Sequence, residues 1–250
     1  MRAIEESPLF ALPESFGLNL METFLLVHGA FHGGWCWSSL VDCLRDTGHR
    51  VYAPTLAGLS DHSHFNPKNI SLETHIGNVC TVIESNDLHG VTLVGHSYGG
   101  MPITGAADRM PDRIQAIIYL DAMVPENGKS ALDIRYPSDT AFPSPNDTGV
   151  IEPVPARVFN VYGALGEWVD RQLRPQPAMS VSQPIRLNGS WQTISKKIYI
   201  RATTYEAPFF DRFFNELSLD PTWDTYQRPW GHDMMITDPE ELADLLMSLL

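Results

Sequence analysis

The sequence is poor in cysteine and has no long apolar run. Its three cysteines, Cys36, Cys43 and Cys80, are odd in number and form no Cys-x-x-Cys pair, which argues against a disulfide framework and a thiolate zinc site and fits a reducing cytoplasm. No stretch approaches the roughly 18 apolar residues of a membrane helix, and the first residues lack a basic-then-apolar secretion signal. We therefore expect a cytoplasmic protein with no membrane partner.

Basic residues are also scarce. Seventeen Lys and Arg stand against 30 Asp and Glu, for a net charge of −13. An acidic surface repels nucleic-acid phosphates and anionic lipids, so we expect no nucleic-acid partner and favour a neutral small molecule as the ligand. His62 and His64 lie two residues apart, but a zinc site needs three or four ligands, and we predict no metal site.

What is present points to one α/β domain. The chain has 250 residues, of which 43% are hydrophobic, enough for a single core. Short apolar segments alternate with amphipathic ones, and long strands of alternating polarity are absent, which predicts a mainly parallel sheet of about six strands with helices on both faces. The expected strands are 22–28, 50–53, 91–94, 114–120, 196–202 and 223–226, and the expected helices are 35–47, 71–85, 101–109, 208–217 and 238–250.

Two segments depart from this alternation. Residues 122–195 carry many prolines and one clear amphipathic piece near 161–173, and they are too many for a loop in a compact domain. We interpret them as an inserted cap over the active site, in a core formed by residues 21–121 and 196–250. Residues 1–20 have little periodicity and are expected to form an N-terminal arm.

The most informative stretch is Val91 to Gly100. A β-branched, aliphatic run leads into Gly95-His96-Ser97-Tyr98-Gly99, and a helical pattern follows. A strand, a Gly-x-Ser-x-Gly turn and a helix in this order predict a nucleophile elbow, in which a strained turn exposes the Ser97 hydroxyl. The unpaired N–H groups at the start of the helix favour negative charge there. The alternative is an ordinary glycine-rich turn between a strand and a helix.

A serine nucleophile needs a base. His232, in Pro229-Trp230-Gly231-His232-Asp233, is the only histidine after Ser97 and lies between the last strand and the last helix. In the α/β-hydrolase arrangement the chain order is serine, acid, histidine, and this order selects His232.

The acid that orients the histidine should follow a strand between these two residues. Asp121 ends the strand directly after the elbow unit, whereas Glu206 lies just beyond the end of a later strand and Asp211 lies in the following helix. We favour Asp121 and keep Glu206 as the main alternative.

The developing oxyanion needs two N–H donors. We assign them to Tyr98, which follows the nucleophile, and to Ala30 in the loop after the first strand, with Phe31 as the alternative. His28 is expected to fix that turn by a hydrogen bond. For substrate binding we select Phe31, Met123 and Trp168, although Met123 and Trp168, like Phe142, Met179 and Trp191, could instead hold the insertion together.

Several motifs resemble one family. Residues 24–37 (FLLVHGAFHGGWCW), 91–101 (VTLVGHSYGGM), 118–126 (IYLDAMVPE), 174–177 (RPQP) and 231–234 (GHDM) are similar to the α/β-hydrolase superfamily, in particular to bacterial esterases related to the plant methylesterase and hydroxynitrile lyase group. The resemblance spans about residues 22–250. It implies a cofactor-free serine hydrolase with a helical cap, acting on a carboxylic ester.

Two departures from the family pattern matter. The plant enzymes carry their acid after the late strand, where this chain has Thr204-Tyr205, whereas pancreatic lipase resembles this chain in placing it after the strand that follows the elbow. Hydroxynitrile lyases have a lysine beside the catalytic histidine, where this chain has Asp233, so lyase activity of that kind is not expected.

We therefore expect a serine esterase with a small-molecule ester substrate. The alternatives are a cofactor-independent lyase or cyclase of a biosynthetic pathway on the same scaffold, and a ligand-binding protein without catalysis. The sequence is compatible with a homodimer and does not decide the oligomeric state.

Overall fold

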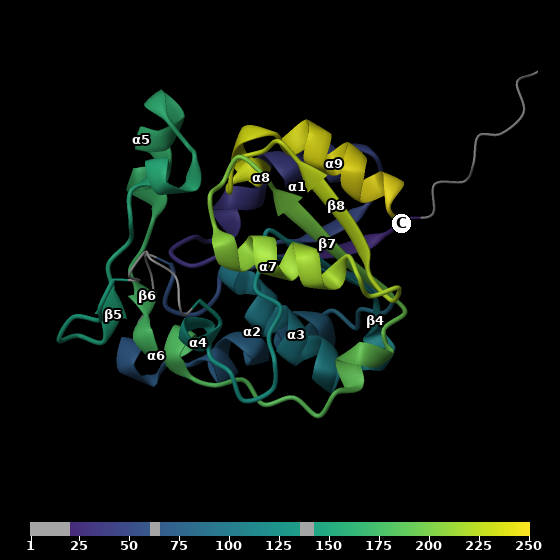
Figure 1. Cartoon of the computed structure of the whole chain (residues 1–250), viewed down its shortest axis with the longest axis horizontal. Helices are drawn as coiled ribbons and strands as arrows, with labels where there is room; N and C mark the ends of the chain where they lie inside the picture. The colour runs from purple at the N-terminus through teal and green to yellow at the C-terminus, as the bar shows by residue number, and fades with distance from the viewer. Residues whose placement is uncertain (1–20, 61–65, 136–142) are drawn as a thin grey trace, which may run out of the picture.

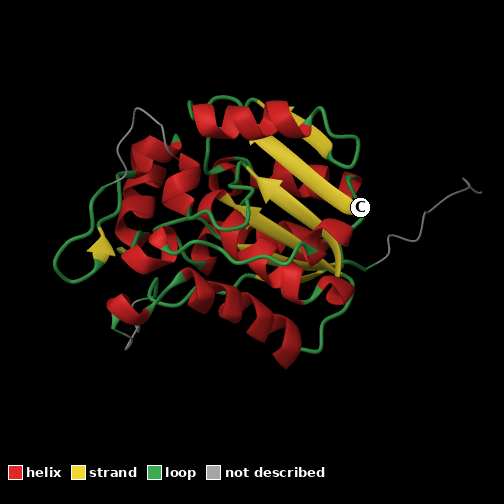
Figure 2. Ribbon diagram, turned by 60° about the horizontal axis from the view of Figure 1, so that its bottom comes forward, coloured by secondary structure: helices red, strands yellow, loops and turns green. Residues whose placement is uncertain are grey.

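The computed structural model describes residues 21–60, 66–135 and 143–250. The predicted arm (residues 1–20) and the residues His62, His64 and Phe142 lie outside this part of the chain. The central sheet has six parallel strands in the order β2-β1-β3-β4-β7-β8. Figure 2 shows strands of this sheet in yellow with helices around them. These are β1 Thr23–Val27, β2 Arg50–Tyr52, β3 Val91–His96, β4 Ile114–Leu120, β7 Lys196–Ala202 and β8 Asp224–Arg228.

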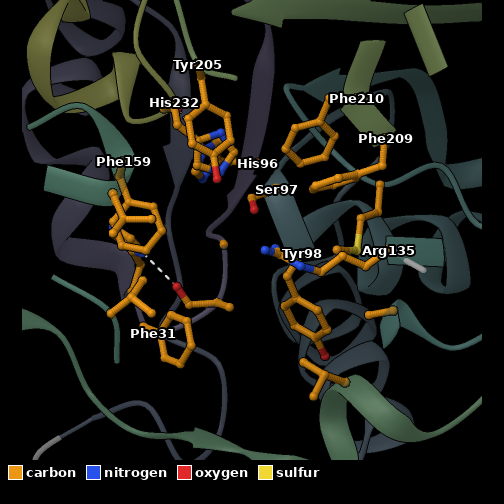
Figure 3. A pocket seen from close by; sticks show the side chains of 18 of the residues that line it. Phe31, His96, Ser97, Tyr98, Arg135, Phe159, Tyr205, Phe209, Phe210 and His232 are labelled. Atoms are coloured by element: carbon orange, nitrogen blue, oxygen red, sulfur yellow. Dashed lines mark hydrogen bonds between the residues drawn. The ribbon is translucent and has the colours of Figure 1, made fainter. Parts of the chain in front are cut away.

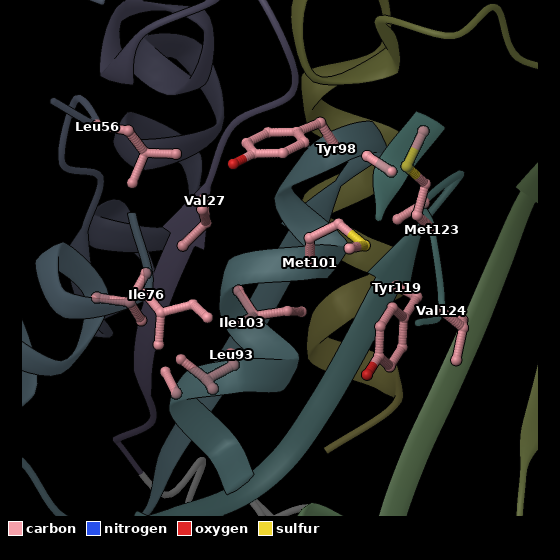
Figure 4. Close-up of a cluster of buried hydrophobic side chains, with 14 of the residues drawn as sticks. Val27, Leu56, Ile76, Leu93, Tyr98, Met101, Ile103, Tyr119, Met123 and Val124 are labelled. Atoms are coloured by element: carbon pink, nitrogen blue, oxygen red, sulfur yellow. The ribbon is translucent and has the colours of Figure 1, made fainter. Parts of the chain in front are cut away.

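Helices cover both faces of the sheet because side chains along a strand alternate between its two sides. In β1, Leu25 and Val27 enter one buried cluster, and Phe24 and Leu26 enter the other. The first cluster includes residues of α2 Leu72–Ser85, α3 Gly100–Arg109 and α7 Pro208–Leu217, and the second those of α1 Ser38–Asp46, α8 Met234–Thr237 and α9 Pro239–Ser248. Figure 4 shows part of the first cluster, from Val27 to Tyr119. The predicted doubly covered parallel sheet is confirmed.

The residues between β4 and β7 form short elements beside the sheet. They are α4 Ala131–Arg135, β5 Val150–Ile151, α5 Gly163–Gln172, β6 Gln176–Pro177 and α6 Ala178–Ser182, with β5 and β6 paired antiparallel. Figure 1 places α5, β5 and β6 on the side toward which the arrows of β7 and β8 point. We keep the name insertion for residues 122–195.

Short 3₁₀ helices complete the chain: η1 Gly34–Trp37, η2 Pro67–Asn69, η3 Ser97–Gly99, η4 Pro111–Arg113, η5 Ala156–Phe159 and η6 Ser190–Thr193. Among the described residues, no helix has the length and apolar character required to cross a bilayer.

Candidate active site

Ser97 lies in a tight turn between β3 and α3. Its φ angle is +53°, in the left-handed region that non-glycine residues rarely adopt. The turn requires its flanking glycines, because a Cβ atom on Gly99 would overlap the carbonyl oxygen of Val27, and one on Gly95 would lie 2.6 Å from Ile103 Cδ1. This is the geometry that the Gly-x-Ser-x-Gly motif predicts.

Backbone strain gathers around this turn. Phe31 (φ +68°), Ser97 and Asp121 (φ +44°) are three of the five non-glycine residues with positive φ in the described part of the chain. They follow β1, β3 and β4, three neighbouring strands whose carboxyl ends meet at one edge of the sheet. Strained residues concentrate at functional sites because such sites need backbone directions that unstrained residues do not supply.

The structure brings His232 and Asp121 together. His232 Nδ1 lies 2.6 Å from Asp121 Oδ2, and both side chains are almost completely buried. Because a carboxylate accepts hydrogen bonds, Nδ1 carries a hydrogen, so in the neutral ring Nε2 is the nitrogen with a free lone pair. Glu206, the alternative acid, is exposed to solvent, and Asp211 pairs with Arg201 instead. The contact with His232 therefore favours Asp121.

Arg201, which the sequence analysis did not single out, holds the other oxygen of Asp121. Its Nη1 lies 2.8 Å from Asp121 Oδ1 and its Nε 2.8 Å from Asp211 Oδ1. Burial lowers the pKa of Arg201, but the Asp121 and Asp211 carboxylates outweigh burial and raise it overall. A permanent cation thus faces the carboxylate that contacts His232. The sequence feature that could have identified Arg201 is its position as the one arginine in the largely apolar strand β7.

The loop after β1 is held by two hydrogen bonds of the His28 ring. His28 Nδ1 donates to the Gly29 carbonyl at 2.8 Å, and His28 Nε2 accepts from the Leu56 N–H at 3.1 Å. Burial lowers the pKa of His28 to about 3, so this ring is neutral at pH 7. His28 therefore makes the turn-fixing bond that the sequence predicts.

The two candidate oxyanion donors of this loop differ. The Phe31 N–H donates to Gln176 Oε1 at 3.0 Å, which engages it inside the protein. Ala30 and Tyr98 both line the cavity beside Ser97, and the Tyr98 N–H lies in the first turn of η3, where N–H groups have no intrahelical acceptor. The geometry favours Ala30 over Phe31.

A cavity of about 280 Å³ opens above Ser97. Figure 3 shows the Ser97 hydroxyl facing it, with His232 and Tyr205 on one side and Phe209 and Phe210 on the other. The Tyr205 ring stacks on His232 with ring centroids 4.2 Å apart. An aromatic lining excludes water, which strengthens the electrostatic interactions within the site.

The predicted substrate-binding residues separate into two groups. Phe31 and Met123 line this cavity. Trp168 is absent from the described lining residues: it is 36% exposed and packs edge-on against Trp35, with ring centroids 5.3 Å apart. Trp191 packs against Trp223 at another groove, and Met179 is largely exposed. Contact of Trp168 with a substrate is therefore not supported.

In the described chain, no group of three or more His, Cys, Asp or Glu side chains is arranged to hold a metal ion.

Comparison with known proteins gives the family. Residues 24–245 match the model of the alpha/beta hydrolase family. A carbendazim hydrolyzing esterase from Nocardioides sp. (strain SG-4G) is 39% identical over 241 residues, covering 92% of this chain and all of that protein. Methylesterase 2 from Arabidopsis thaliana is 37% identical over 110 residues, covering 43% of this chain and 41% of that protein.

Solved structures agree in fold. An extracellular alpha/beta-hydrolase from a Paenibacillus species superposes with a TM-score of 0.74 at 23% identity, covering 91% of this chain and 98% of that one. The pyrethroid hydrolase PytH superposes with a TM-score of 0.74 at 20% identity, covering 91% and 96%. With a matching family model over most of its length and the expected sheet order, the chain belongs to the α/β-hydrolase family.

Proposed function

We propose that this α/β-hydrolase is a serine esterase that cleaves a small-molecule carboxylic ester through Ser97, His232 and Asp121. The observation that carries the proposal is the 2.6 Å contact between His232 Nδ1 and Asp121 Oδ2 at the cavity into which the strained Ser97 turn opens. The 39% identity to an esterase over most of the chain supports the same reaction class.

The reaction follows from these positions. Ser97 Oγ attacks the acyl carbon while His232 Nε2 takes its proton, and the Ala30 and Tyr98 N–H groups bind the oxyanion. His232 then protonates the departing alcohol, and a water molecule, deprotonated by the same nitrogen, cleaves the acyl-enzyme. Asp121 fixes the tautomer of His232 and stabilises its imidazolium form, and Arg201 pairs with the other oxygen of Asp121.

The cavity restricts the substrate. At about 280 Å³, with Phe31, Phe159, Tyr205, Phe209 and Phe210 in its lining, it suits a small ester with a flat or aromatic group. Arg135, whose guanidinium lies 5.3 Å from the centroid of the Phe209 ring, is the only arginine or lysine among the described lining residues. Arg135 would favour a substrate that carries an electron-rich oxygen near the substrate's own aromatic ring.

We further propose that the insertion acts as the substrate-selecting cap. Ala131, Leu132, Val154 and Phe159 reach the cavity from it, whereas Ser97 and His232 come from the core. The name of the Nocardioides relative makes carbendazim, an aromatic methyl carbamate, a direct candidate for a substrate panel.

The test is release of p-nitrophenol from short acyl esters by wild type and by Ser97→Ala, with carbendazim and methyl benzoate as further substrates. We expect hydrolysis by wild type and its loss in the variant. Wild type that hydrolyses none of these esters, and whose Ser97 does not react with a fluorophosphonate, would contradict the proposal. Labelling of Ser97 with no acid product from any ester would indicate either a cap too selective for these esters or a lyase or cyclase.

A further inference from the structure

A second buried His–Asp pair lies beside Ala30, and its histidine, His32, also lines the cavity. His32 Nε2 is 3.0 Å from Asp233 Oδ2, and the two side chains are 1% and 0% exposed. The residues are 201 positions apart in the chain, and neither takes part in the proton transfers proposed above. Burying two charged side chains costs free energy even when they are paired. The presence of this pair therefore calls for a functional explanation.

The hydrogen bonds determine where its protons lie. His32 Nδ1 is 2.8 Å from the Ala30 carbonyl oxygen, which can only accept, so Nδ1 carries a hydrogen. Burial lowers the pKa of His32, but the Asp233 carboxylate and the hydrogen bonds to Asp233 and Ala30 raise it overall. Since the Asp233 carboxylate oxygen is also an acceptor, both ring nitrogens can donate, and this geometry stabilises His32 as an imidazolium paired with a carboxylate.

The surroundings favour that charge. The Trp35 ring stacks on His32 with ring centroids 5.3 Å apart, an arrangement that attracts a cation. Burial lowers the pKa of His28 to about 3 and that of His96 well below its ordinary value, and it raises the pKa of the Cys36 thiol. These neighbours are therefore neutral at pH 7.

The pair joins two parts of the proposed active site. On one side, His32 holds the Ala30 carbonyl, while His28 holds the Gly29 carbonyl, so both peptide units that flank Ala30 are fixed. On the other side, Asp233 directly follows His232, whose carbonyl accepts a hydrogen bond from His96 Nε2 at 2.9 Å. A shift of Asp233 or His32 would therefore displace both Ala30 and His232.

We propose that His32 and Asp233 are positioning residues, whose ion pair aims the Ala30 N–H at the oxyanion and fixes the spacing between that donor and His232. This inference rests on the proposed esterase function. The donor must match an oxyanion that exists only in the transition state, so a displaced donor lowers kcat and leaves substrate binding nearly unchanged.

The experiment compares Asp233→Asn, His32→Gln and the double variant with wild type. Each is measured for kcat, KM and inhibition by phenylboronic acid, whose tetrahedral adduct with serine places an oxygen where the oxyanion forms. We expect kcat to fall roughly 10- to 100-fold and the inhibition constant to rise by a similar factor, with KM within about twofold. The double variant should lose no more than the worse single one, because the pair acts as a unit.

His49→Gln is the matched control, since His49 is a buried histidine that accepts a hydrogen bond from the Glu22 N–H near the start of β1. It should change stability and leave kcat and inhibition unchanged. Folded Asp233→Asn and His32→Gln with wild-type kcat and inhibition, beside an inactive Ser97→Ala, would overturn the inference and leave the esterase proposal standing. An inactive wild type would contradict the esterase proposal first.

Nitrogen NMR of the wild type covers the case in which the variants do not fold. At about pH 6.5, the ordinary histidine pKa, where a free histidine is half protonated, both ring nitrogens should carry protons in more than half of the His32 side chains. A singly protonated His32 at that pH would overturn the ion pair.

Discussion

The Asp121 carboxylate contacts two side chains, one at each oxygen: His232 contacts Oδ2 and Arg201 contacts Oδ1. The Ala202 N–H also donates to Oδ1 at 3.2 Å. Asp121 therefore has its direction fixed before any substrate binds. A fixed carboxylate is what holds an imidazole in one tautomer during two successive proton transfers.

Replacing Asp121 with Asn tests this role directly. The amide cannot stabilise the imidazolium, so kcat should fall roughly 10³- to 10⁴-fold, as in other triads, while circular dichroism shows an intact fold. Glu206→Gln is the control, since Glu206 is exposed, and its kcat should equal that of wild type. An active Asp121→Asn beside an inactive Glu206→Gln would reverse the assignment of the acid.

Replacing Arg201 with Met should cost stability as well as activity. Arg201 is 2% exposed, and its removal leaves Asp121 as a buried charge without its cation, a change that typically costs about 3–5 kcal/mol. Urea denaturation should show this loss. Arg109→Met removes a more exposed pair with Glu73, which should cost at most about 1 kcal/mol. Equal losses of unfolding free energy in the two variants would contradict a larger stabilising role for Arg201 than for Arg109.

At the scale of elements, the loop after β1 is tied to the insertion. The Phe31 N–H donates to Gln176 Oε1, and the Phe31 carbonyl accepts from the Arg174 N–H at 2.9 Å. Gln176 is completely buried. The Arg-Pro-Gln-Pro segment thus binds the backbone beside the proposed oxyanion donor, which gives a structural reason for that motif.

Gln176→Leu should therefore lower both stability and kcat. The buried Phe31 N–H loses its acceptor, which costs about 1–3 kcal/mol, and the strained Phe31 backbone can relax, which moves Ala30. Gln183→Leu is the matched control, because Gln183 Oε1 accepts from the Glu73 N–H at a more exposed place in the insertion. Steady-state kinetics that show equal kcat in both variants would refute the link between insertion and loop.

The sequence predicted the core elements well and the insertion poorly, for physical reasons. Strands β1, β3 and β4 are short apolar runs bounded by glycine, proline or polar residues, so their positions are encoded locally. In the insertion, β5 and β6 have two residues each, and α4 and α6 have five. Elements this short are stabilised by tertiary contacts, and local periodicity does not reveal them.

The same distinction applies to the site. Ser97, His232 and Asp121 could be proposed from the sequence because chain order and strand ends limit the choice. Arg201 and the His32–Asp233 pair could not, since their partners lie 80 and 201 residues away. The position of Trp168 away from the described lining residues has a similar cause, because the direction of a side chain in the insertion depends on packing that the sequence does not display.

At the scale of the whole molecule, buried neutral histidines limit stability in acid. Burial lowers the pKa of His28 to about 3, that of His75 to about 4, and that of His96 well below its ordinary value. Below about pH 6.5 the unfolded chain binds protons that the folded chain does not. Each such histidine then removes up to about 1.4 kcal/mol of stability per pH unit.

Urea denaturation between about pH 7 and pH 5 checks this expectation. The free energy of unfolding should fall toward pH 5 in wild type, and its slope should be smaller in His75→Gln, which lacks one of the linked groups. Protonation of exposed acids reduces the net charge of −13 and acts in the opposite direction in both proteins, so it cancels in the comparison. Identical slopes would contradict the linkage.

The position of the acid has a consequence for how this scaffold can change. Under the proposed assignment the acid is Asp121, directly after β4, and the turn after β7 takes no part in proton transfer; its residues Thr203, Thr204 and Glu206 are exposed while Tyr205 lines the cavity. In a hydrolase whose acid occupies that turn, altering it removes catalysis. Here the same turn is left open to change under this assignment, and substitutions at the exposed positions 203, 204 and 206 should leave turnover intact.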